Sequence, residues 1–207
     1  MYVYLWAHKW GNVCVKSGLL GQSCYKVLLE DCHVKQTTGL AKTSCAFKDD
    51  TPEEAAKTFN ELNFRLQKLV DYLYRKYNTD DGSHAARIKD QLRQLTINYS
   101  PKAIHEVDPH NISGDTSYVE GKGRIIGICL RDPKTLRIHD INTLTFVFLH
   151  EATHLSIKAI QHPPEFWSAF GALLKEAIDA KIYTYVDYYK YPVNYCGMTI
   201  QTTPLRL

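Results

Sequence analysis

The chain has 207 residues, of which 44% are hydrophobic and 23% charged, and its formal net charge at pH 7 is +3. This composition is typical of a globular domain with one core of ordinary size, and the charge is too small to indicate DNA association by itself. No apolar run reaches the roughly 18–20 residues of a membrane span, and the first residues lack the pattern of a secretory signal. We therefore expect an intracellular protein that has no membrane partner.

Residues 1–50 show short apolar runs broken by glycines, without a regular period. We expect this stretch to be an N-terminal extension of a domain that covers residues 51–207. No CxxC pair occurs, so a structural zinc site has little support. We expect the cysteines to be free thiols, with a disulfide or a second metal as alternatives, and Cys129 to be a small buried apolar residue. The N-terminal cysteines are Cys14, Cys24, Cys32 and Cys45.

A long amphipathic helix is predicted for residues 52–77. Thr51 is a suitable N-cap, Pro52 suits the first helical position, and Glu54 completes a capping box. Apolar residues then recur at intervals of three and four as far as Tyr77, which gives one continuous stripe. We expect this stripe to pack on the sheet of its own domain, and a short coiled coil is the alternative.

A second helix and four strands are predicted before residue 131. The helix covers residues 84–95, and we interpret its basic residues as a solvated face. Gly121 and Gly123 mark a turn between the last two strands, which predicts a hairpin. The predicted strands are residues 95–99, 103–107, 116–120 and 124–130.

The most informative pattern is the pentad His150-Glu151-Ala152-Thr153-His154. Residues four apart lie on the same face of a helix, so His150 and His154 can bind one metal ion. Glu151 lies beside the first ligand, where it can accept a proton from a water molecule on that ion. The residues before the pentad are almost wholly apolar and Asp140 is a suitable N-cap, which predicts a buried helix whose polar groups need partners. A divalent metal is such a partner, and hydrogen-bonded core histidines are the alternative.

A catalytic zinc ion takes three protein ligands and leaves one position open. The best candidate for the third ligand is His162, because the dipeptide Pro163-Pro164 ends the metal helix before it and starts a new helix after it. A turn histidine without a ligand role is the alternative for His162. The alternative ligands are Glu165 and then Glu176, because a carboxylate from a following helix is another common solution.

The next helix carries a broad apolar stripe that runs from Phe166 to Ile178, and we expect Phe166 and Trp167 to belong to the core. The chain after this helix is rich in tyrosine and is predicted to be a loop with short extended pieces. Packing is the simplest role of these aromatic residues. Two functional alternatives remain, because Tyr195 could donate a hydrogen bond to an oxyanion and Met198 could lie under the metal as an apolar floor.

These residues together resemble the WLM and SprT-like group of zinc metallopeptidases. The similarity rests on the pentad, on a histidine eight residues after it, and on the Pro-Glu-Phe-Trp segment that opens the next helix. It extends over about residues 60–200, and WLM-like proteins of large DNA viruses and some eukaryotes are the most similar. The resemblance implies a minimal zincin fold with His150, His154 and His162 as zinc ligands and Glu151 as the catalytic carboxylate. Such sites usually carry a glycine shortly before the third histidine to make a left-handed turn, and Gln161 stands there instead.

The resemblance also implies a fold class and a substrate site. We expect an α+β, zincin-like domain in which a small mixed sheet packs on the buried metal helix and its flanking helices. In such folds a substrate adds to one sheet edge as an extended strand. Thr116, Ser117 and Tyr118 are our candidates for that edge, and burial of their hairpin inside the sheet is the alternative. The expected activity is zinc-dependent hydrolysis of peptide bonds in a protein or peptide substrate.

Two other functions compete with this expectation. One is a DNA-associated protease that acts on DNA-bound or crosslinked proteins, as the resemblance suggests, although the net charge does not support DNA association. The other is a catalytically silent, zinc-stabilised interaction or virion protein. The intact pentad argues against the silent protein, because a purely structural zinc site has no need for Glu151. The viral resemblance extends the expected locations to the cytoplasm or nucleus of a host cell and to a virion.

Overall fold

The computed structural model describes residues 10–17, 21–28, 32–36, 43–47, 52–110 and 116–205, and its described side chains begin at Glu54. The predicted N-cap Thr51 and the state of the four N-terminal cysteines therefore lie outside the described part. The described residues form four α-helices and nine strands, so the chain is a mixed α+β protein with small sheets. No helix in this part is long and apolar enough to cross a membrane.

The largest sheet has five strands in the order β3-β4-β5-β7-β6. Its inner pairs β4–β5 and β5–β7 are parallel, and its outer pairs β3–β4 and β7–β6 are antiparallel. The sheet is thus mixed, and β6 lies at one of its edges. Two strands that come from the first 50 residues belong to this sheet, and the predicted domain boundary at residue 50 stays a prediction. The strands are β3 (Cys32–Gln36), β4 (Thr43–Phe47), β5 (Ile104–Glu106), β6 (Ser117–Glu120) and β7 (Ile125–Ile128).

Two further antiparallel hairpins lie at opposite ends of the sequence. The first pairs β1 (Trp10–Ser17) with β2 (Gly21–Leu28), in a part of the chain where the sequence predicted no elements. The second pairs β8 (Val193–Tyr195) with β9 (Met198–Ile200), which confirms the prediction of short extended pieces near the C-terminus.

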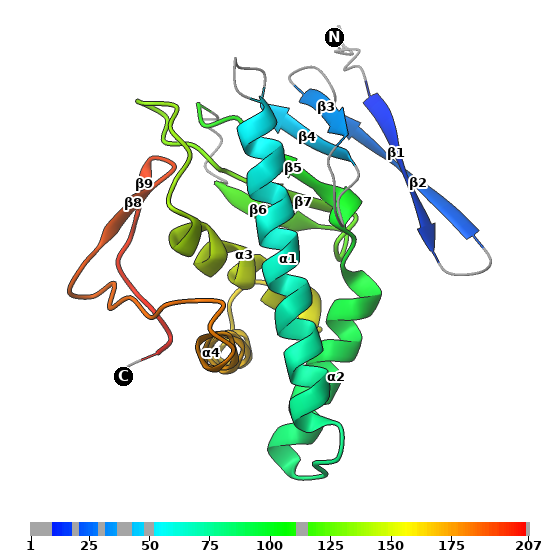
Figure 1. The fold of residues 1–207 in the computed structure, drawn as a ribbon, viewed down its shortest axis with the longest axis vertical. Helices are drawn as coiled ribbons and strands as arrows, with labels where there is room; N and C mark the ends of the chain where they lie inside the picture. The colour runs from blue at the N-terminus through cyan, green and yellow to red at the C-terminus, as the bar shows by residue number, and fades with distance from the viewer. Residues whose placement is uncertain are drawn as a thin grey trace, which may run out of the picture.

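The first two helices run along the long axis of the molecule (Figure 1). Helix α1 (Pro52–Tyr77) has the predicted bounds, and its buried stripe includes Leu62, Leu66, Leu69 and Leu73. It contacts β4, α2 and α3, so it packs on the five-stranded sheet as expected, although β4 lies outside the predicted domain of residues 51–207.

Helix α2 (Ser83–Asn98) continues through the predicted strand 95–99, and that prediction was wrong. Ile88, Leu92 and Leu95 are buried on one face at helical spacing, while Ile97 is 67% exposed. Burial of this stripe outweighs the β-propensity of the last residues. A short 3-10 helix, Pro101–Ala103, then leads into β5.

Helix α3 (Ile141–Ser156) and helix α4 (Pro164–Asp179) carry the predicted motif and the helix after it. Asp140 is the N-cap of α3, as predicted, and accepts hydrogen bonds from the backbone N–H groups of Asn142 and Thr143 at 2.8 and 2.9 Å. The residues between Leu144 and Leu149 are all buried, so α3 runs through the core between α2, α4 and β6.

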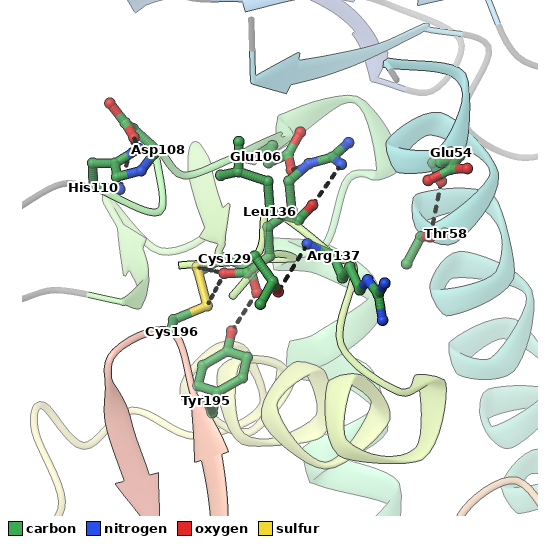
Figure 2. A network of polar contacts seen from close by, with 12 residues as sticks. Glu54, Thr58, Glu106, Asp108, His110, Cys129, Leu136, Arg137, Tyr195 and Cys196 are labelled. Atoms are coloured by element: carbon green, nitrogen blue, oxygen red, sulfur yellow. Dashed lines mark hydrogen bonds and ion pairs between the residues drawn. A yellow bond between two sulfur atoms is a disulfide. The ribbon is translucent and has the colours of Figure 1, made fainter. Parts of the chain in front are cut away.

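A disulfide joins Cys129, at the end of β7, to Cys196, in the turn of the β8–β9 hairpin. The prediction of free thiols is therefore wrong for these two cysteines. The hydroxyl of Tyr195 donates to the carbonyl oxygen of Cys129 at 2.7 Å, so a covalent bond and a hydrogen bond hold the hairpin against the sheet (Figure 2). Sequence spacing gave no sign of this bond, because it closes a separation of 67 residues.

Candidate metal centre

Three imidazoles converge at the C-terminal part of α3. The Nε2 atom of His162 lies 2.9 Å from Nε2 of His150 and 3.2 Å from Nε2 of His154. One ring nitrogen from each residue lies within 4.8 Å of the other two, and this is the one cluster of potential metal ligands among the residues that the structure describes. The predicted convergence of these side chains is therefore present.

The helix positions two of the three rings. His150 and His154 are four residues apart on α3, so their rings lie one above the other with centroids 5.2 Å apart. The buried apolar run before them anchors the helix, and Asn98 Nδ2 donates to the carbonyl oxygen of Leu155 near its end. Helix α3 ends at Ser156 with Ile157 as its C-cap, which frees the chain to turn back towards the site.

The third ring comes from the turn between α3 and α4. Gln161 has a φ of 63°, the left-handed conformation that glycine adopts most easily. This conformation costs a non-glycine residue about 1–2 kcal/mol. The residue before His162 therefore makes a left-handed turn without a glycine, and the surrounding structure must stabilise it.

An aromatic wall on α4 supports the imidazoles. The ring centroid of Phe166 lies 4.4 Å from that of His154 and 4.7 Å from that of His162. The ring of Trp167 is stacked on that of His162, with the two centroids 5.6 Å apart. Phe166 is buried as predicted, but Trp167 is 41% exposed, so its predicted core position was wrong. Adjacent helix residues point about 100° apart, and only Phe166 can face the core here.

The imidazoles are held in the neutral state. Burial, and then the neighbouring imidazoles, lower the pKa of His150 to about 3. Burial, and then His162 and Lys122, lower the pKa of His154 to about 4. Burial also lowers the pKa of His162. Within the described residues, the hydrogen-bonding contacts of these rings run only between their own Nε2 atoms, so three imidazole nitrogen atoms that could bind a metal share one small space.

Glu151 lies beside this cluster and is 5% exposed. It lines a cleft of about 460 Å³ together with the three imidazoles, β6 and the loop around Ile160. A buried carboxylate next to neutral nitrogen ligands is the arrangement that a metal-assisted general base requires.

The turn between β6 and β7 closes one side of the cleft. Lys122 Nζ donates to the carbonyl oxygen of Ile157 at 3.0 Å, so its positive charge lies at the negative end of the α3 dipole. Gly123 has a φ of 90°, and a Cβ atom there would lie 2.0 Å from the carbonyl oxygen of Asn98. Only glycine fits this position. The two glycines predicted the turn, but no local pattern predicted the contact of Lys122 with the end of α3.

The predicted substrate edge borders the same cleft. Ser117 and Tyr118 of β6 line it, and β6 has no partner strand on its outer side among the described strands. The side-chain hydroxyls are already engaged. Ser117 Oγ lies 2.7 Å from the Tyr195 hydroxyl, Tyr118 bonds to His105 at 3.1 Å, and Thr116 donates to the sulfur of Met198 at 3.3 Å. The backbone of the edge is therefore the part suited to binding an extended chain.

Tyr195 is 1% exposed, and its hydroxyl donates to the Cys129 carbonyl oxygen. Burial raises the pKa of this hydroxyl, and the charge of Glu151 adds to the effect. The Tyr195 hydroxyl would have to leave this carbonyl to serve an oxyanion, and that role stays a prediction.

Three other predicted roles do not agree with the structure. Glu176 was an alternative ligand, but it is bound by Lys76 and Tyr77 at the other end of α4. Glu165 is exposed and is not part of the imidazole cluster. Met198 is 48% exposed rather than beneath the imidazoles, and the apolar floor is the ring of Phe166.

Comparison with known proteins finds relatives in two viruses. An uncharacterized protein of Acanthamoeba polyphaga mimivirus is 33% identical over 156 residues, which cover 74% of this chain and 75% of that protein. An uncharacterized protein of Invertebrate iridescent virus 3 is 38% identical over 154 residues, which cover 66% of this chain and 94% of that protein. No protein-family model and no solved structure matches the chain. The chain therefore belongs to a protein family of large DNA viruses that includes these mimivirus and iridescent virus proteins.

Proposed function

We propose that this protein is a zinc-dependent endopeptidase of the WLM and SprT-like type, with a minimal zincin fold. The observation that supports this proposal best is the convergence of three neutral imidazoles beside one buried carboxylate in an open cleft. A protein that used these histidines only for packing would gain nothing from crowding three neutral rings together, because their nitrogen atoms cannot all be satisfied by one another.

The donor set fits zinc. Zinc–nitrogen bonds of about 2.0–2.1 Å in a tetrahedral site hold two ligand nitrogens about 3.3 Å apart. The Nε2 atom of His162 lies 2.9 and 3.2 Å from those of His150 and His154, and all three donor atoms lie within 4.8 Å of one another, so small movements of the rings would admit the ion. Three neutral imidazoles with one open position are a known catalytic ligand set for zinc, and they favour it over calcium or magnesium, which prefer oxygen ligands.

Zinc held by such a ligand set supplies Lewis-acid chemistry, acidifying a water molecule and polarising a carbonyl group. The Glu151 carboxylate accepts the proton of the attacking water and passes it to the leaving amine. The backbone of β6 binds the substrate as an additional strand, with Thr116, Ser117 and Tyr118 beside the scissile bond. The rings of Phe166 and Trp167 keep the imidazoles in position and exclude water from one side of the site.

The test is the Glu151→Gln variant of the zinc-loaded chain of 207 residues, with Glu165→Gln as its control. Both substitutions remove one carboxylate, but Glu165 is exposed and lies outside the cluster. We expect Glu151→Gln to keep its zinc, measured by elemental analysis, and to lose about 10²- to 10⁴-fold in peptide hydrolysis. Glu165→Gln should retain both properties. Undiminished hydrolysis by Glu151→Gln would refute the assigned base, and a wild-type protein without hydrolysis would refute the enzyme.

A further inference from the structure

A second hollow opens on the other side of the candidate catalytic residues. It has a volume of about 450 Å³ and shares Ser117, His150, Glu151 and His162 with the cleft described above. It is therefore continuous with the place where a scissile bond would lie. Ligand pockets commonly measure roughly 300–1,000 Å³, and a hollow near the lower end of that range suits one large side chain.

Three elements supply apolar walls to this hollow. Phe146 and Val147 come from the turn of α3 before His150, Phe170 comes from α4, and Ile200 comes from β9. All four are at most 8% exposed, so the walls are parts of the packed core. Rigid walls of this kind give a pocket a fixed shape, because core side chains rest in defined rotamers.

Two large apolar side chains at the rim of the hollow face solvent, beside the exposed polar residues Thr199, Gln201 and Thr202. Met198 is 48% exposed on β9, and Trp167 is 41% exposed on α4. Large apolar side chains that surround a concave site and remain exposed are typical of a surface that another molecule covers. Trp167 and Met198 line the same hollow as Glu151. A molecule that covers these two side chains would therefore lie next to the candidate catalytic residues.

The charge of the hollow limits what can enter it. Apart from Glu151 and the two imidazoles, its lining residues are uncharged, and the polar ones are hydroxyls, the amide of Gln201 and backbone groups. An aspartate or glutamate side chain would lose its hydration there without gaining a partner of opposite charge. The one carboxylate that could pair with a lysine or arginine is that of Glu151, which is assigned to the attacking water. The chemistry of the walls thus favours an uncharged apolar side chain.

We propose that this hollow binds a large apolar side chain, such as that of phenylalanine, leucine or methionine, on a residue that flanks the scissile bond of the substrate. The proposal rests on the endopeptidase function proposed above and assigns that enzyme a specificity pocket. The C-terminal hairpin, which the Cys129–Cys196 disulfide and Tyr195 hold against the sheet, is then part of the substrate site. A preference for one large apolar residue separates this enzyme from a protease that cleaves any unfolded chain.

The experiment uses fluorogenic peptides that differ only in the residues next to the scissile bond. With the zinc-loaded wild-type protein, we expect kcat/KM for a phenylalanine, leucine or methionine peptide to exceed that for the alanine, aspartate and lysine peptides by roughly 10- to 200-fold. Met198→Arg should reduce this preference about tenfold and improve cleavage of the aspartate peptide, because it adds a positive charge at the rim. Tyr191→Arg is the control, since Tyr191 is 59% exposed on the same C-terminal segment and does not line the hollow.

Binding provides a second measurement that does not depend on turnover. Fluorescence anisotropy measures the affinity of zinc-loaded Glu151→Gln for labelled peptides that it does not cleave. We expect these affinities to rank the peptide side chains in the same order as kcat/KM does. Adding Met198→Arg to this variant should reduce the differences in affinity. Cleavage or binding without a preference, or with a preference for charged side chains, would overturn the pocket and leave the endopeptidase intact. An apolar ranking in binding without any hydrolysis by the wild-type protein would support the pocket and overturn the endopeptidase.

Discussion

Two polar clusters lie near the two ends of α4, and they differ in whether each polar group has a partner within the cluster. At the N-terminal end, His150, His154 and His162 lie together as three neutral rings, and Trp167 and Phe166 pack around them. At the C-terminal end, the carboxylate of Glu176 accepts hydrogen bonds from Lys76 at 2.7 Å and from Tyr77 at 2.6 Å.

The Glu176 cluster is complete without any additional molecule. Its carboxylate is 4% exposed, and each oxygen has a donor from α1. Burial, followed by the hydrogen bond to Glu176, raises the pKa of Tyr77 to about 12, so this phenol keeps its proton. In the imidazole cluster, the two hydrogen-bonding contacts join Nε2 atoms of the rings themselves, and burial, followed by the neighbouring imidazoles, lowers the pKa of His150. A cluster whose polar groups are hydrogen-bonded within the protein stabilises the fold. A cluster beside a cleft whose polar groups lack such partners indicates that a ligand supplies them.

The largest expected effect is a stabilisation by zinc that depends on the imidazole cluster and does not depend on the Glu176 cluster. At a free zinc concentration 100 times the dissociation constant, binding should raise the free energy of unfolding by about 3 kcal/mol. His154→Gln should abolish this gain, and Glu176→Gln should keep it, as measured by thermal unfolding with and without zinc. An equal gain in His154→Gln would show that zinc binds elsewhere and would remove the contrast between the two clusters.

A smaller effect is expected for the Glu176 cluster itself. Glu176→Gln removes the negative charge of the carboxylate to which Lys76 and Tyr77 donate hydrogen bonds. The free energy of unfolding, measured by urea denaturation, should fall by about 1–3 kcal/mol. Asp179→Asn is the control, because Asp179 is 45% exposed and lies 3.4 Å from Lys76, so it should change stability by less than about 1 kcal/mol. A stability unchanged by Glu176→Gln would mean that the hydrogen bonds of this cluster contribute nothing.

His105 sharpens the comparison, because it is a single imidazole outside both clusters. Burial lowers its pKa to about 4, and its Nε2 atom lies 3.1 Å from the hydroxyl of Tyr118. The unfolded chain binds a proton near pH 6.5 and the folded chain does not, so stability is present above pH 6.5 and is lost as the pH falls towards 4.

We expect His105 to account for about 1–2 kcal/mol of the stability lost between pH 6.5 and 5. Urea denaturation at several pH values gives the free energy of unfolding of the wild-type protein and of His105→Gln as a function of pH. The difference between the two slopes is the contribution of His105. His110→Gln makes the same side-chain change at an exposed histidine and is the matched control. Parallel slopes for the wild-type protein and His105→Gln would show that His105 is not held neutral by the fold.

Local patterns predicted those elements whose cause lies within a few residues. The bounds of α1 agree with those predicted from its helix-start pattern and its apolar stripe, and the facing of His150 and His154 followed from helical geometry. The hairpin of β6 and β7 followed from its glycine turn. These features depend on spacing, which a sequence displays directly.

Features that depend on distant contacts were missed or predicted wrongly. The strand expected at residues 95–99 is helical because Leu95 completes a buried stripe. The Cys129–Cys196 disulfide depends on where the C-terminal hairpin folds back, and the support that Trp167 gives His162 depends on the packing of α4 against the preceding turn. Neither has a local signature, although a pair of cysteines separate from the N-terminal four could have suggested the disulfide.

The central claim is that one zinc ion belongs between three imidazoles. Crystals of the zinc-loaded protein, measured on both sides of the zinc absorption edge, test it most directly. We predict a single anomalous peak about 2.0–2.1 Å from the Nε2 atoms of His150, His154 and His162, with Glu151 beside the open position. A map without a peak there, or with the peak at other side chains, would contradict the account.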